Sequence, residues 1–104
     1  MEGLGTYGGT PGKIIGKILG SAMGSLTEDL IFNSEQSAKD IGQNAAQSAA
    51  VGLMSALSSE YWEYAIKIAN EAGSAAKMLM KYDEKSGEAL KYFFEGIASA
   101  LSAG

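Results

Sequence analysis

Two kinds of side chain in this sequence could do chemistry, namely adjacent carboxylates and grouped lysines. The carboxylates occur as Glu28-Asp29 and Asp83-Glu84. Neighbouring residues on a helix point about 100° apart, so the two acids of each pair diverge instead of meeting on one substrate. The chain has no histidine and no cysteine to act with them, which removes the usual general base and the thiolate ligands. We therefore expect caps and turns there, and we predict no enzymatic activity, no cofactor and no catalytic or metal-binding residue.

The lysines lie in groups. Lys13 and Lys17 are one helical turn apart, and the residues that would share one face of a second, continuous helix are Lys77, Lys81 and Lys85. Lysines neutralise phosphates without reading base sequence, so these five are candidates for non-specific contacts with double-stranded DNA. The alternative is a solvated surface with ion pairs to nearby glutamates. Arginine is absent and the net charge is −4, which argues against sequence-specific recognition.

A glycine-rich helix must position the first lysines. Its glycines recur at every fourth residue, as Gly12, Gly16, Gly20 and Gly24, and therefore form one bare row, called here the glycine ladder. Each glycine inside a helix costs about 0.8–1 kcal/mol relative to alanine, a large sum beside the roughly 5–15 kcal/mol that stabilises a small domain. Close approach of another helix would offset this cost, so we predict that the glycine ladder is a helix-packing surface.

Composition favours association with other copies. The 104 residues form one expected domain, of which 46% are apolar and only 19% charged, against about 25% charged in typical soluble domains. A domain of this size buries only about two thirds of its unfolded surface, so apolar surface remains to be covered. The uncharged segment 41–59 carries too many amide and hydroxyl side chains for a membrane span, and we do not expect a membrane partner.

The spacing of apolar and small residues predicts an all-α fold without strands. We expect a single helical domain over 1–104, with a flexible Gly-rich arm at residues 1–10 and an antiparallel helical hairpin or bundle after it. The predicted helices are 11–32, 34–57, 60–82 and 87–103. Small residues spaced four and three apart form two seams, at 38–56 and 65–76. These seams are expected to pack against each other in antiparallel fashion.

Two aromatic clusters follow the seams. They are Tyr61, Trp62 and Tyr64, and later Tyr92, Phe93 and Phe94. Because successive helical residues point in different directions, each cluster needs neighbours on more than one side. They could be ordinary core residues of a bundle or contacts between subunits, and we adopt the second interpretation as the hypothesis.

The Gly-rich arm at 3–9, the glycine ladder at 12–24, the two seams and the aromatic clusters together resemble the small all-helical major coat proteins of rod-shaped or filamentous archaeal viruses. The clavavirus type is the most similar in character, and the resemblance covers the whole length in overall character only. It implies a helical hairpin that packs in a helical homopolymer around double-stranded DNA. The expected location is the virion, with the host cytoplasm before assembly.

The first hypothesis is therefore a structural, self-assembling subunit, a major capsid protein that packages DNA in a rod-shaped or filamentous virion. One alternative is a pilus or secretion-filament subunit without nucleic acid. Another is a membrane-active helical toxin, suggested by the basic, amphipathic segment 13–19. A soluble four-helix bundle that does not assemble is the remaining interpretation.

Overall fold

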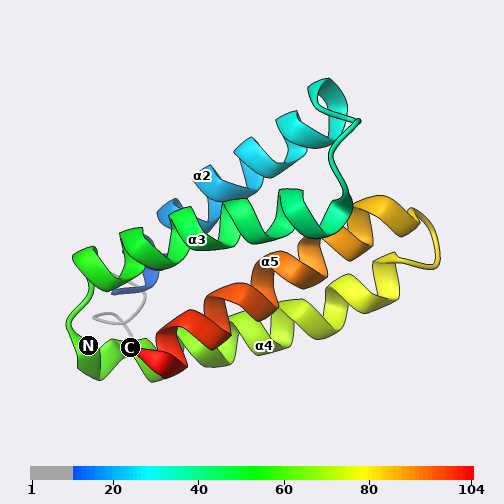
Figure 1. The fold of residues 1–104 in the computed structure, drawn as a ribbon. Helices are drawn as coiled ribbons and strands as arrows, with labels where there is room; N and C mark the ends of the chain where they lie inside the picture. The colour runs from blue at the N-terminus through cyan, green and yellow to red at the C-terminus, as the bar shows by residue number, and fades with distance from the viewer. Residues whose placement is uncertain (1–10) are drawn as a thin grey trace.

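The computed structural model describes residues 11–104 and folds them into four α-helices and one short 3-10 helix (Figure 1). They are α2 (Pro11–Phe32), α3 (Ala38–Ala56), η1 (Ser59–Tyr61), α4 (Trp62–Leu79) and α5 (Glu84–Ala103). This part of the chain contains no strand, so the prediction of an all-α fold is confirmed. The Gly-rich arm predicted at residues 1–10 lies outside the described residues.

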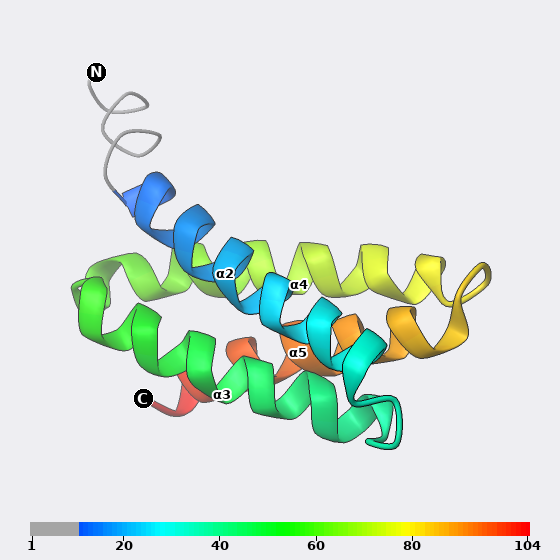
Figure 2. The ribbon, with the colours of Figure 1, turned by 90° about the horizontal axis from the view of Figure 1, so that it is seen from above.

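The helices form an elongated bundle with extents of 44 × 24 × 23 Å. Consecutive helices run in roughly opposite directions (Figure 1), and α2 crosses the others obliquely when the bundle is seen from above (Figure 2). α5 packs against α3 on one side and against α4 on the other, whereas α2 packs mainly on α3. α5 is therefore the central helix.

Helix α3 begins four residues later than predicted. The Ser37 hydroxyl accepts a hydrogen bond from the backbone N–H of Asp40 at 3.1 Å, which satisfies one of the free donors at the helix start. The segment between Phe32 and Ser37 is a turn, in which the Gln36 backbone N–H donates to the Asn33 carbonyl at 3.0 Å. Ser37 is therefore the N-cap of α3.

Helix α5 begins three residues earlier than predicted, because Asp83 caps it. The Asp83 carboxylate accepts hydrogen bonds from the Ser86 hydroxyl at 2.8 Å and from the Ser86 backbone N–H at 3.2 Å. These two bonds lower the pKa of Asp83 below its usual value, and the bond from the hydroxyl has the larger effect. Helix α4 has ended by then, at Leu79, so the predicted helix 60–82 is also shorter than expected.

The two small-residue seams do not pack on each other, which corrects the prediction: both pack mainly on α5, and the α3 seam also meets Ile18 of α2 at Gly52. A Cβ added at Gly42 of α3 would collide with the Ala89 carbonyl and lie 2.8 Å from the Tyr92 Cβ. On the α4 side, Ala65, Ala69 and Ala76 are buried. Small side chains let both helices approach α5 closely, and α5 lies between them (Figure 1).

The core forms where α5 meets its neighbours. Its largest fully buried side chains come from α2, α3 and α5 and are Ile15, Leu26, Ile41, Leu53, Phe93 and Ile97. Helix α2 supplies two of these from one face. The opposite face of α2 is exposed to solvent.

Candidate assembly surfaces

Three of the four glycines of the ladder are not used for packing within residues 11–104. Gly16, Gly20 and Gly24 are exposed, and a Cβ added at any of them would find no atom within 4 Å. Gly12 is partly buried. The glycines of α3 and α5 behave differently, since a Cβ at Gly96 would lie 2.7 Å from the Ala46 Cβ. Packing within residues 11–104 therefore does not require glycine at positions 16, 20 and 24.

The ladder belongs to a larger exposed surface, the outer face of α2. It lies opposite the buried residues Ile15, Ala22 and Leu26. Its members are all exposed and are Lys13, Gly16, Lys17, Gly20, Gly24, Thr27, Glu28 and Ile31. Ile31 is 63% exposed and the neighbouring Phe32 is 77% exposed, which is unusual for side chains of this size.

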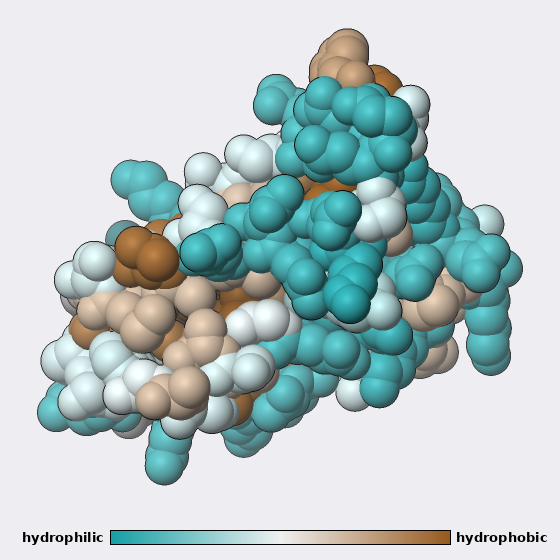
Figure 3. Space-filling view, in the orientation of Figure 1, coloured by the Kyte–Doolittle hydropathy of each residue, from teal (hydrophilic) through white to brown (hydrophobic). Residues whose placement is uncertain are grey.

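Other large apolar side chains are also exposed. They are Val51 on α3, Tyr64, Met78 and Leu79 on α4, and Tyr82 in the following loop. Figure 3 shows apolar surface at the outer end of α2 and over the left half of the molecule, while the right half of this view is mostly hydrophilic. Uncovered apolar surface of this kind is typical of contact sites.

The second aromatic cluster lies largely in the core. Phe93 is 0% exposed and Phe94 is 6% exposed, and their rings meet edge to face at 4.8 Å. Tyr92 is partly buried, with the Lys91 ammonium 4.7 Å from its ring centre. The expectation that Phe93 and Phe94 contact other subunits is therefore wrong, because α5 is the central helix and turns these rings towards its neighbours in the chain.

The first aromatic cluster shapes the connection from α3 to α4. The Trp62 indole N–H donates to the Leu57 carbonyl at 3.3 Å, and both Trp62 and Tyr61 are partly buried. Tyr64 is 38% exposed. Of the three, Tyr64 is the one best placed to contact another molecule.

The structure does not bring the predicted DNA-facing lysines together. Lys13 and Lys17 lie near the start of α2, and Lys77 and Lys81 lie near the end of α4, at the opposite end of the bundle (Figure 2). Lys85 belongs to α5 and donates to the Ser34 carbonyl at 2.8 Å. Because α4 ends before Lys85, the continuous helix face assumed for the second group does not exist.

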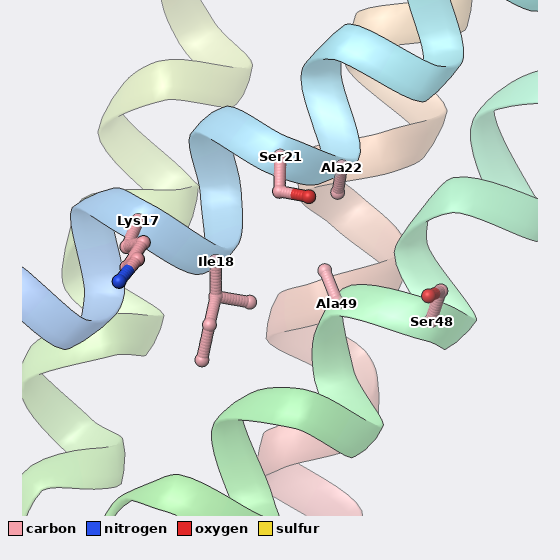
Figure 4. Close-up of a pocket in the computed structure, with 6 residues that line it drawn as sticks. All are labelled: Lys17, Ile18, Ser21, Ala22, Ser48 and Ala49. Atoms are coloured by element: carbon pink, nitrogen blue, oxygen red, sulfur yellow. The ribbon is translucent and has the colours of Figure 1, made fainter.

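Two hollows open beside α2. The first, of about 330 Å³, lies between α2 and α3 and is lined by Lys17, Ile18, Ser21, Ala22, Ser48 and Ala49 (Figure 4). In this view Ile18 points towards α3, and a Cβ added at Gly52 would lie 3.4 Å from it. One lysine and small side chains do not make a convergent catalytic group.

The second hollow, of about 290 Å³, lies between α2, α4 and α5. Its lining is entirely apolar and consists of Met23, Ala72, Ala75, Ala76, Leu79, Leu90 and Phe94. It holds no titratable side chain, so it offers space for apolar groups only.

Two further kinds of site are absent from residues 11–104. No three potential ligands among His, Cys, Asp and Glu come close enough in this part of the chain to hold a metal ion. None of its helices combines the length and apolar character needed to span a bilayer. The apolar face of the basic segment 13–19 already packs on the core through Ile15 and Ile18.

No known protein family, curated protein or solved structure matches this chain. The outer face of α2 is the one that combines uncovered glycines, charges and a large apolar side chain.

Proposed function

We propose that this protein is a structural subunit that assembles with copies of itself through the outer face of α2. The observation that carries the proposal is the open space beside Gly16, Gly20 and Gly24. Three exposed glycines inside one helix together cost about 3 kcal/mol relative to alanine. That is a large fraction of the stability of a small domain. A second helix seated on the ladder offsets this cost through close packing.

The remaining surface supports the same proposal. Ile31 and Phe32 at the end of α2, and Met78 and Tyr82 near the end of α4, are all more than 60% exposed. An open polymer needs either a contact between two different patches or two separate self-complementary patches on each copy. The exposed end of α4 gives the molecule a second apolar surface besides the outer face of α2.

The specific form proposed is the major coat protein of a rod-shaped or filamentous virion, packed in a helical homopolymer around DNA. The all-α bundle and the exposed ladder support this form, together with the resemblance in overall character to clavavirus-type coat proteins. Non-specific phosphate contacts would come from Lys77 and Lys81, which are exposed, whereas the equally exposed Lys13 and Lys17 lie on the assembly face itself.

A filament subunit without nucleic acid, such as a pilus or secretion-filament subunit, is the second candidate. It is favoured by the division of the lysines between the two ends of the bundle (Figure 2) and by the net charge of −4. Assembled particles that protect DNA from nuclease support the coat protein. Particles free of nucleic acid support the second candidate.

Electron microscopy of purified protein tests the assembly proposal, with Gly20→Leu as the variant. Leucine favours a helix more than glycine does, and the site has open space in the monomer, so the variant keeps its helicity while its side chain blocks the approach of a second helix. Ser99→Leu, at an exposed position of α5, is the control for added surface hydrophobicity. We expect filaments from the control and none from Gly20→Leu. Filaments from both would contradict the proposal.

A further inference from the structure

We infer that two copies of this chain pair through the outer faces of their α2 helices in antiparallel orientation, about a two-fold axis that passes between Gly20 and Gly24. The inference rests on the proposed function and deepens it, because it names the partner, the orientation and the register of one contact. The order of the charges along the outer face of α2 sets the orientation of the pair. The glycines set only how closely the helices approach.

The charges on this face have a fixed order. Lys13 and Lys17 lie in the first half of α2, and Glu28 lies near its end, all three exposed. None of the three has an ion-pair partner within residues 11–104. In a parallel pair of α2 helices each charge would face its own copy, and like charges repel. An antiparallel pair places lysines opposite the glutamate twice, once at each end.

The register follows from helix geometry. With the two-fold axis level with Ala22, Gly20 of one copy lies opposite Gly24 of the other. Glu28 then lies between Lys13 and Lys17 of the second copy. At a rise of about 1.5 Å per residue, it is offset along the axis by about 1.5 Å from Lys17 and about 4.5 Å from Lys13. Both distances are within reach of flexible lysine side chains.

The exposed isoleucine of this face gains a neighbour in the same register. Ile31 lies level with Lys13 of the second copy, whose aliphatic stem can cover it while the ammonium group stays in water. Ile31 is 63% exposed in the single chain. Antiparallel pairing therefore covers an apolar side chain and matches opposite charges at one contact.

Such a contact is isologous, with the same patch used by both copies, and it closes on itself as a dimer. Growth into a filament then requires a second, different contact between dimers. The inferred pair is therefore the building block of the proposed polymer.

Charge reversal tests the pairing, measured by sedimentation at low ionic strength. We expect K13E/K17E and E28K each to weaken self-association by at least about tenfold, because each turns attraction into repulsion at both ends of the pair. An equimolar mixture of the two variants restores association, since every facing charge is again opposite. The triple variant K13E/K17E/E28K restores it in a single chain. K39E/K67E is the matched control, with the same change of net charge at exposed positions of α3 and α4 outside both proposed contact surfaces, and is expected to associate like the wild type.

Unfolding does not explain the expected loss. Acidic side chains near the start of a helix and basic ones near its end favour the helix dipole, so both reversals support α2. The restored mixture is itself evidence that each variant is folded.

The outcomes separate this inference from the proposed function. If the wild type assembles and K13E/K17E assembles equally well, the antiparallel pairing is overturned while self-assembly stands. If the wild type remains a monomer under all conditions, both fail. If K13E/K17E leaves self-association unchanged and abolishes binding to duplex DNA, the outer face contacts nucleic acid and the pairing is overturned.

Discussion

Helices α5 and α2 use small residues in opposite ways. In α5, a Cβ at Gly87 would lie 2.6 Å from the Met80 backbone nitrogen, and one at Gly96 would lie 2.7 Å from the Ala46 Cβ. In α2, the space beside Gly20 is empty. Glycine thus allows close packing within the chain in α5, whereas the exposed glycines of α2 contact no other helix. This difference places α5 in the core and is the basis for proposing the outer face of α2 as the assembly surface.

The largest expected effect separates a buried phenylalanine of α5 from an exposed one of α2. Phe93→Ala removes a fully buried ring and should lower the free energy of unfolding by about 3–5 kcal/mol. Phe32→Ala makes the same change at a position 77% exposed and should shift it by less than about 0.5 kcal/mol. Urea denaturation at low protein concentration measures both. Equal losses would remove the distinction between the two helices.

Alanine in place of glycine should destabilise the chain where a helix packs on α5. Gly42→Ala puts a methyl group against the Ala89 carbonyl and the Tyr92 Cβ, so α3 and α5 must separate, at a cost of about 1–3 kcal/mol. The urea midpoint should fall. A midpoint at or above that of the wild type would show that α3 and α5 are not in close contact.

Alanine in place of a glycine of the ladder should stabilise the single chain instead of destabilising it. Gly20→Ala meets no atom within 4 Å and should raise monomer stability by about 0.5–1 kcal/mol, because alanine favours the helix. Self-association should weaken at the same time. A less stable monomer would place Gly20 in a contact within the chain.

The smallest expected effect concerns the start of α5. Since the hydrogen bonds from Ser86 lower the pKa of Asp83, the capping contribution is present above the ordinary pKa of 3.8 and is lost as the pH falls through the lower folded value. Asp83→Ala should therefore be slightly less stable than the wild type at pH 7 and indistinguishable from it in strong acid. Denaturation at several pH values makes this comparison. A difference that grows in acid would contradict the cap.

Some of the structure could be predicted from the sequence because it depends on local spacing. The spacing of the small residues indicates helices, and Ala45, Ala49, Ala65 and Ala69 are buried as seams should be. The helix on which each seam packs is decided by the tertiary structure and not by local spacing. The predicted pairing of the seams with each other is wrong because α5 competes for both, and a sequence pattern does not rank such alternatives.

The candidate surface could be predicted only in part for the same reason. The sequence does not distinguish a core position from a subunit contact for Phe93 and Phe94, because an aromatic cluster does not indicate whether its neighbours belong to the same chain. The grouping of Lys85 with Lys77 and Lys81 holds only for one continuous helix, and the break predicted between helices 60–82 and 87–103 already separates them. The glycine spacing was visible in the sequence, but the open space beside Gly20 required the fold.

The most direct test of the central claim is sedimentation equilibrium of the purified wild-type protein over a wide range of concentrations. Self-assembly through the outer face of α2 predicts species larger than the 10.8 kDa single chain, whose proportion grows with concentration and falls in Gly20→Leu. A mass of one chain at every concentration would contradict the account.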